Sequence, residues 1–116
     1  MEGNDLQKRL FAFAVDTIRA IRKLPKASEY LIIARQLIKS STSSGANYNE
    51  AQAAVSKADF TNKVGISLKE MRESNYWILI IIEILDNPDE WLRLDKESRE
   101  LMNILGSIYA KTSLHR

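Results

Sequence analysis

The sequence contains no cysteine, one histidine (His115), two prolines and four separate glycines among 116 residues. Without thiols there is no disulfide framework and no thiolate metal site, and one imidazole supports neither a histidine-rich metal centre nor a nucleophile–histidine pair. The longest uninterrupted apolar run, residues 76–82, is far shorter than the roughly 20 residues that span a bilayer. We therefore expect a cytoplasmic protein that is not an enzyme, has no cofactor and does not enter a membrane.

Apolar residues make up 45% of the chain and charged residues 28%, a balance typical of one globular domain covering residues 1–116. The net charge of +2 is unevenly distributed. Residues 1–57 hold nine Lys or Arg against five Asp or Glu, whereas residues 58–116 hold eight against ten. This asymmetry permits a weakly basic face, although solvated helix surfaces of mixed sign would give the same count.

Apolar residues recur at intervals of three and four along most of the chain, and the two prolines, Pro25 and Pro88, stand where this pattern lapses. The pattern predicts helices over about residues 5–24, 28–55, 57–86 and 90–112. Four helices with short connections and no credible strand predict an all-α fold, an antiparallel up-and-down four-helix bundle. The first helix carries its stripe on Leu6, Leu10, Phe13, Ala14, Thr17, Ile18, Ile21 and Leu24.

Residues 37–51, LIKSSTSSGANYNEA, resemble a flexible Ser/Gly linker in composition. A linker would break the register of the apolar stripe, but Leu37, Ser41, Ser44 and Tyr48 continue it in steps of three and four. The helix propensity lost at the glycine is at most about 1 kcal/mol. Packing of the stripe can outweigh that loss, so a continuous helix is predicted.

The third helix has a start signal in Ser56 followed by Asp59, a hydroxyl N-cap with an acid in the first turn. Asp89 or Asp95 would cap the fourth helix. The apolar residues 78–82 widen the stripe of the third helix to nearly every side, so its C-terminal half should be deeply buried or face a partner chain. The predicted partner surface consists of Trp77, Ile80, Ile81 and Ile84.

Several polar residues lie on or beside the apolar stripes of the second and third helices. One interpretation is a structural network in which Asn47 and Glu50 meet groups on the third helix, because buried polar groups must be paired. The other is that they are solvated flanks. Glu50, Glu70 and Glu73 would be the ligands of a carboxylate metal site, a minor alternative without inward histidines. The candidate network comprises Asn47, Glu50, Lys63, Glu70 and Glu73.

The stretch from Gln36 to Trp77 resembles the four-helix-bundle family named for the 23S rRNA intervening sequences. The resemblance rests on an apolar-basic helix that enters a Ser-rich turn, followed by Ala-Asn-x-x-Glu-Ala, Ser-x-x-Asp-Phe, a lysine and Glu-x-x-Glu/Ser-x-x-Trp. It implies a closed bundle that assembles into a ring, expected to be a homopentamer, without enzymatic activity. A more distant similarity is to the accessory variability protein of diversity-generating retroelements, a basic pentameric barrel implicated in binding nucleic acid and a reverse transcriptase. The matching positions are Gln36, Leu37, Ser41, Ser44, Ala46, Asn47, Glu50, Ala51, Ser56, Asp59, Phe60, Lys63, Glu70, Glu73, Tyr76 and Trp77.

Two functions follow as hypotheses. The first is an oligomeric module that binds RNA or DNA weakly through basic residues of the first two helices. Phe11, Phe13 and Tyr30 are the aromatic residues nearest to these cations, which is sparse for base stacking. The second is a scaffold or accessory subunit that binds a protein such as a reverse transcriptase. The candidate nucleic-acid contacts are Arg19, Arg22, Lys23, Lys26, Arg35 and Lys39.

Overall fold

The computed structural model describes residues 3–114, and the regular structure within that range is entirely helical. The helices are α1 (Gly3–Ile21), α2 (Ser28–Ala51), α3 (Lys57–Ile84) and α4 (Asp89–Leu114). The hydroxyl of Ser56 caps α3 by accepting a hydrogen bond from the backbone N–H of Asp59 at 3.0 Å. The carbonyl of Pro88 accepts the N–H groups of Trp91 and Leu92 in the first turn of α4. The predicted all-α four-helix fold is confirmed.

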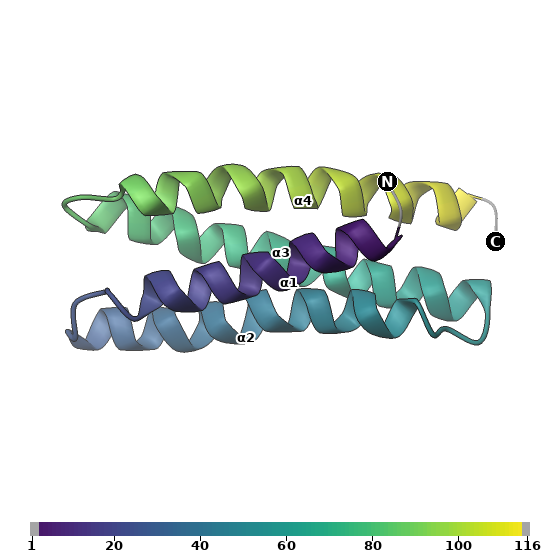
Figure 1. Ribbon diagram of the computed structural model, residues 1–116, viewed down its shortest axis with the longest axis horizontal. Coiled ribbons are helices and arrows are strands. Elements are labelled where there is room, and N and C mark those ends of the chain that lie inside the picture. Colours follow the sequence, from purple (N-terminus) through teal and green to yellow (C-terminus); the bar gives the residue numbers. More distant parts are fainter. Residues whose placement is uncertain (1–2, 115–116) are drawn as a thin grey trace.

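The four helices lie antiparallel to their sequence neighbours in an elongated bundle that measures 46 × 20 × 20 Å between its outermost Cα atoms (Figure 1). Helix α2 packs between α1 and α3, and α3 packs between α2 and α4. The contact between α2 and α3 is the most extensive, and that between α1 and α4 is the least. The bundle is therefore built around the α2–α3 pair, with α1 the most loosely held helix.

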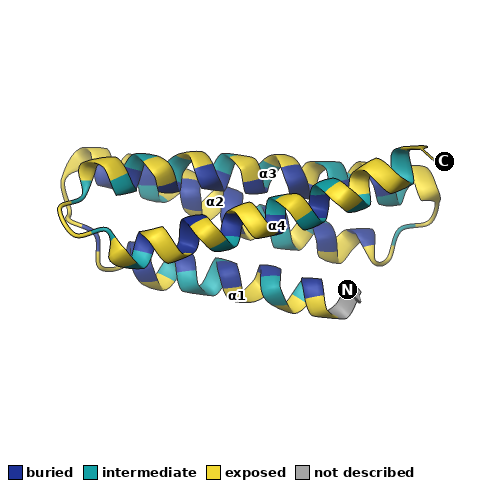
Figure 2. Cartoon of the chain, turned by 90° about the horizontal axis from the view of Figure 1, so that it is seen from above, coloured by how far each residue is buried: buried dark blue, intermediate teal, exposed yellow. Residues whose placement is uncertain are grey.

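The core runs along the bundle axis, where the buried positions of all four helices face one another (Figure 2). The predicted stripe of α1 is confirmed at Leu6, Leu10, Phe13 and Thr17, each at most 1% exposed. Fully buried side chains of the other helices fill the space opposite them. These side chains are Leu37, Val64, Met71, Ile78, Ile81, Leu94, Leu101 and Leu105.

The Ser-rich segment 37–51 lies inside α2 and not in a linker, as its register predicts. Two helix ends differ from the predicted ones by three residues or more. Helix α1 ends at Ile21 and not at 24, and α2 ends at Ala51 and not at 55. In both cases the last turn tightens into bonds between residues three apart, from Leu24 N to Ile21 O and from Ala54 N to Ala51 O.

The C-terminal half of α3 is only partly buried. Ile78 and Ile81 are completely enclosed, whereas Tyr76, Leu79 and Ile84 are 58%, 48% and 44% exposed. Ile81 therefore cannot belong to a surface that meets a partner, contrary to the prediction. The helix presents apolar side chains to the core and to the outside at the same level.

Candidate functional site

The six predicted nucleic-acid contacts all have exposed side chains on the half of the bundle that holds the α1–α2 turn. Lys23 Nζ makes an ion pair with Glu90 Oε2 of α4 at 2.8 Å. No carboxylate in the described range pairs with the other five cations. The turn joins antiparallel helices, so it brings the end of α1 close to the start of α2 (Figure 1). The five cations without a carboxylate partner are Arg19, Arg22, Lys26, Arg35 and Lys39.

The predicted network between α2 and α3 is not formed by its five candidate residues. Asn47 Nδ2 donates to the carbonyl and hydroxyl of Ser43, at 2.9 and 3.1 Å, one turn earlier in α2. Glu50 is exposed. Lys63 lies 3.6 Å from a carboxylate oxygen of Asp59 in its own helix. Within residues 3–114, no hydrogen bond or ion pair connects any of the five to the opposite helix.

The same holds for the two glutamates of α3. Glu73 Oε2 accepts a hydrogen bond from Trp77 Nε1 at 3.2 Å, one turn later, and the backbone carbonyl of Glu70 accepts from the hydroxyl of Ser74. Both bonds stay within α3. Among the described residues, none of the five candidate side chains therefore bonds across the contact between α2 and α3.

Serines, and not the predicted residues, connect α2 with α3. The hydroxyls of Ser40 and Ser74 lie 2.8 Å apart. One turn further along, the hydroxyl of Ser44 donates to the carbonyl of Ser67 at 2.8 Å, and the hydroxyl of Ser67 donates to the carbonyl of Ser44 at 2.7 Å. All four residues are fully buried. Such reciprocal bonds require the two backbones to approach closely, which only small side chains permit.

A second buried polar group joins α3 to α4. Asn75 Nδ2 donates to Asp95 Oδ1 at 2.7 Å and to the hydroxyl of Ser98 at 2.8 Å. The other Asp95 oxygen accepts from Arg99 Nη2 at 2.9 Å. Asp95 is thus a buried partner in the second turn of α4, so of the two caps considered for this helix, Asp89 and Asp95, it is not the one. The sequence hints at this buried polar group through Ser98, a hydroxyl residue that stands between Leu94 and Leu101 at the three-and-four spacing of the buried side of α4.

Ion pairs hold α1 against α4. The guanidinium of Arg9 contacts both oxygens of Glu97, at 2.6 and 3.1 Å, and Glu100 at 3.2 Å. The hydrogen bond to Glu97 raises the pKa of Arg9 above its ordinary value. Asp16 and Arg93 approach to 3.8 Å on the same side. These ion pairs connect the two helices that share the least extensive contact.

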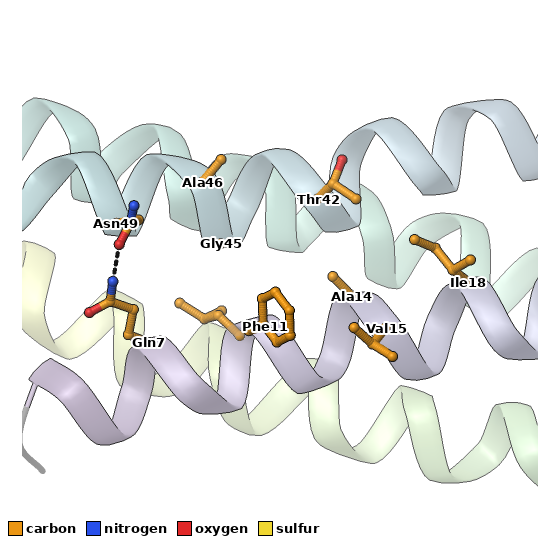
Figure 3. Close-up of a pocket in the computed structure, with 10 residues that line it drawn as sticks. Gln7, Phe11, Ala14, Val15, Ile18, Thr42, Gly45, Ala46 and Asn49 are labelled. Carbon is orange, nitrogen blue, oxygen red and sulfur yellow. Dashed lines mark hydrogen bonds between the residues drawn. The ribbon is translucent and has the colours of Figure 1, made fainter.

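A groove of about 430 Å³ runs along the surface between α1 and α2 (Figure 3). Leu10 and Gly45 are among its lining residues, and a Cβ at Gly45 would lie 3.5 Å from the Cβ of Leu10, an ordinary contact distance. The side chain of Gln7 donates to that of Asn49 at one end. Phe11 is 72% exposed in the wall of the groove. The groove is lined chiefly by Phe11, Ala14, Val15 and Ile18 of α1 and by Gly45 and Ala46 of α2.

The described part of the chain holds no cluster of metal ligands and no helix fit to span a membrane. Between residues 3 and 114, no three His, Cys, Asp or Glu side chains come together as metal ligands would, so Glu50, Glu70 and Glu73 do not form such a group. His115 lies outside the described residues. None of the four helices contains a stretch with the length and hydropathy of a membrane span.

The comparisons with known proteins agree with this fold. A family model for the 23S rRNA-intervening sequence protein matches residues 2–107, and the chain belongs to that family. The crystal structure of a protein of unknown function from the S23 ribosomal protein family of Bacteroides thetaiotaomicron is 32% identical in sequence and superposes with a TM-score of 0.85. That match covers 95% of this chain and 99% of the other. No curated protein matches the sequence. The similarity to the retroelement accessory protein stays a prediction.

Proposed function

We propose that this member of the 23S rRNA-intervening sequence protein family is a non-catalytic, homo-oligomeric module that binds the phosphate backbone of RNA or DNA. The supporting observation is the group of five exposed cations without a carboxylate partner around the α1–α2 turn. A cation already held in an ion pair must leave its carboxylate before it can bind phosphate. These five need no such exchange, and each one that binds releases counterions from the nucleic acid.

The aromatic residues favour backbone binding over base recognition. Phe13 and Tyr30, two of the three aromatic side chains nearest to the cations in sequence, are buried and cannot stack on bases. The third, Phe11, is exposed but lies in the wall of the groove. Contacts to phosphate position a protein without reading sequence. We therefore expect weak binding with little sequence preference.

Fluorescence anisotropy with a stem-loop RNA and a DNA duplex, at several salt concentrations, tests this function. Each lost phosphate contact should reduce the slope of log K against log salt by about 0.9 on duplex DNA. A variant with Arg19, Lys26 and Lys39 changed to Gln should thus lose up to about 2.7 of slope by that rule. The matched control changes Lys69, Lys96 and Lys111, three exposed cations of α3 and α4, to Gln.

The control variant has the same net charge as the test variant, so it separates a local site from general attraction. It should keep the wild-type slope. The proposed function is wrong if neither nucleic acid binds at low salt, or if both variants lose affinity equally.

A protein partner is the second candidate function, as expected of a scaffold or of an accessory subunit of an enzyme such as a reverse transcriptase. The observation in its favour is the pair of exposed apolar side chains Leu79 and Ile84 on α3, beside the half-buried Ile80. Binding of a purified reverse transcriptase that survives the Arg19, Lys26 and Lys39 substitutions, but not Ile84→Ser, would support it. Loss with the cation variant alone would count against it.

A further inference from the structure

The two turns at one end of the bundle carry opposite charges. Residues 19–26 hold four Lys or Arg and no carboxylate, whereas residues 83–90 hold four Asp or Glu and no Lys or Arg. Both stretches lie at the same end, because α1 and α3 run toward it and α2 and α4 start from it (Figure 1). An acidic turn therefore lies beside the cationic turn that the proposed function assigns to phosphate.

Within residues 3–114, one ion pair joins these two turns. Lys23 Nζ lies 2.8 Å from Oε2 of Glu90, a residue of the first turn of α4. The side chain of Lys23 is 69% exposed and that of Glu90 is 37% exposed, so the pair is open to a ligand in solution. Lys23 follows Arg22 directly and precedes Lys26 by three residues, and neither of these two has a carboxylate partner in the described range. Lys23 thus belongs to the cationic turn by position, but its charge is already neutralised.

The ion pair is weak enough for a phosphate to take the place of the carboxylate. An exposed pair shifts an equilibrium by at most about fivefold, because water screens both charges. One phosphate contact gains about eightfold in affinity in 0.1 M salt relative to 1 M, because it releases counterions from the nucleic acid. Lys23 and Glu90 also line a cavity of about 390 Å³ between the two turns, which gives both side chains room to separate without repacking the core. The carboxylate and a phosphate are therefore closely matched competitors for this ammonium group.

We propose that Glu90 is an intramolecular competitor that holds Lys23 back from phosphate, and that Lys23 becomes a sixth phosphate contact when this ion pair opens. The inference rests on the proposed function and adds a regulation of the same site. Five cations can bind phosphate without an exchange of partners, whereas the sixth can do so only after it leaves Glu90. Removal of the Glu90 charge should therefore convert a site of five contacts and a partial sixth into a site of six.

A carboxylate near a phosphate site can also act by general repulsion, without holding any particular cation. Glu83 separates these two explanations. It is an exposed acid in the last turn of α3, at the same end of the bundle, and no cation pairs with it among residues 3–114. Glu83→Gln and Glu90→Gln change the net charge equally, but only Glu90→Gln releases Lys23.

Fluorescence anisotropy of the full chain with the stem-loop RNA and the DNA duplex tests the competition. Glu90→Gln should raise the affinity about threefold in 0.1 M salt. On duplex DNA it should also make the slope of log K against log salt steeper by up to about 0.9. The matched control Glu83→Gln should leave the affinity within about 1.5-fold of the wild type, because salt screens a charge that touches no cation of the site.

A double-mutant cycle shows whether the gain passes through Lys23. Lys23→Gln alone should lower the affinity only about twofold, since the ion pair already limits this contact in the wild type. In the Lys23→Gln background, Glu90→Gln should change neither the affinity nor the slope, because no ammonium group remains to be released. An equal gain in both backgrounds would show general repulsion and overturn the inference.

Acetylation by acetic anhydride, located by peptide mass spectrometry, gives a readout at the residue itself. With saturating RNA, Lys23 should be acetylated about threefold more slowly in Glu90→Gln than in the wild type, because phosphate covers it for more of the time. Lys69 of α3 should react equally in both proteins. Circular dichroism at 222 nm should show native helix content in every variant, since each substituted side chain is an ion at the surface.

The inference and the proposed function fail in different ways. Equal affinities of Glu90→Gln and Glu83→Gln, in a protein that binds nucleic acid and loses slope in the three-cation variant described above, remove the inference alone. Equal acetylation of Lys23 in the two RNA complexes also removes it. Absence of binding by the wild type and by Glu90→Gln at low salt removes both.

Discussion

The buried group at Asn75 should be worth a large share of the stability of the fold. Asn75→Ala removes a hydrogen bond to the Asp95 carboxylate and another to the Ser98 hydroxyl. Bonds to charged groups contribute about 1.5–3 kcal/mol and neutral ones about 0.5–1.5 kcal/mol. After subtraction of about 0.5 kcal/mol for the better helix propensity of alanine, the expected loss is about 1.5–4 kcal/mol. In this variant the Asp95 Oδ1 oxygen would stay buried but lose the hydrogen bond that Asn75 Nδ2 donates to it.

Urea unfolding followed by circular dichroism at one protomer concentration measures this loss as a shift of the midpoint. Asn62→Ala is the matched control, because Asn62 is an exposed asparagine of the same helix, and it should change stability by less than about 0.5 kcal/mol. A cycle with Asp95→Ala should give a coupling energy of about 1–3 kcal/mol. If Asn75→Ala costs no more than the control, the group does not stabilise the contact between α3 and α4 and the reasoning fails.

Three further predictions concern single side chains. Burial raises the pKa of the Tyr48 phenol, so above pH ~10 the unfolded chain loses this proton first and the free energy of unfolding falls as pH rises. In urea titrations, Tyr48→Phe should lose less stability than the wild type between pH 8 and pH 11. An equal loss in both proteins would contradict this assignment. Arg9→Met should cost about 1 kcal/mol at low salt and much less in 1 M NaCl, whereas Arg19→Met, at an unpaired cation, should show neither effect. Thr17→Val should raise the free energy of unfolding by about 1 kcal/mol in thermal melts, because the buried Thr17 hydroxyl has no partner among the described residues. Thr112→Val is the control: it loses a hydrogen bond to Ile108 O and should give no gain in the same measurement.

The sequence predicts the fold well because burial follows the three-and-four spacing. Leu6, Leu10 and Phe13 lie where their stripe places them, and Ser56 caps α3 as its spacing with Asp59 indicates. The helix register also carries through the serines of residues 40–44, since it depends on position and not on the hydrophobicity of each residue. Local periodicity thus determines the helices and the side of each one that faces the core.

The polar contacts between helices are less predictable. Asn47 reaches a carbonyl of its own helix within 2.9 Å, so it needs no partner across the bundle. Whether such a side chain bonds within its helix or across depends on the distance and axial offset between the two backbones. The distance and the offset depend on how closely the small side chains of Ser44 and Ser67 let α2 approach α3. The residue pattern of one helix alone does not contain this information. The predicted cations do lie on one half of the bundle, because antiparallel neighbours bring the end of α1 beside the start of α2; whether they contact nucleic acid stays a prediction.

The unequal contacts of the four helices imply an order of local opening. Helices α2 and α3 share the most extensive contact and two levels of buried serine hydrogen bonds, whereas α1 and α4 share the least extensive one, with partly exposed ion pairs across it. Regions with few buried contacts open with less free energy than the whole molecule. The amide hydrogens of α1 should therefore exchange with deuterium before those of α2 and α3. Helix α1 forms one wall of the groove, so the groove should open whenever α1 separates locally from the rest of the bundle.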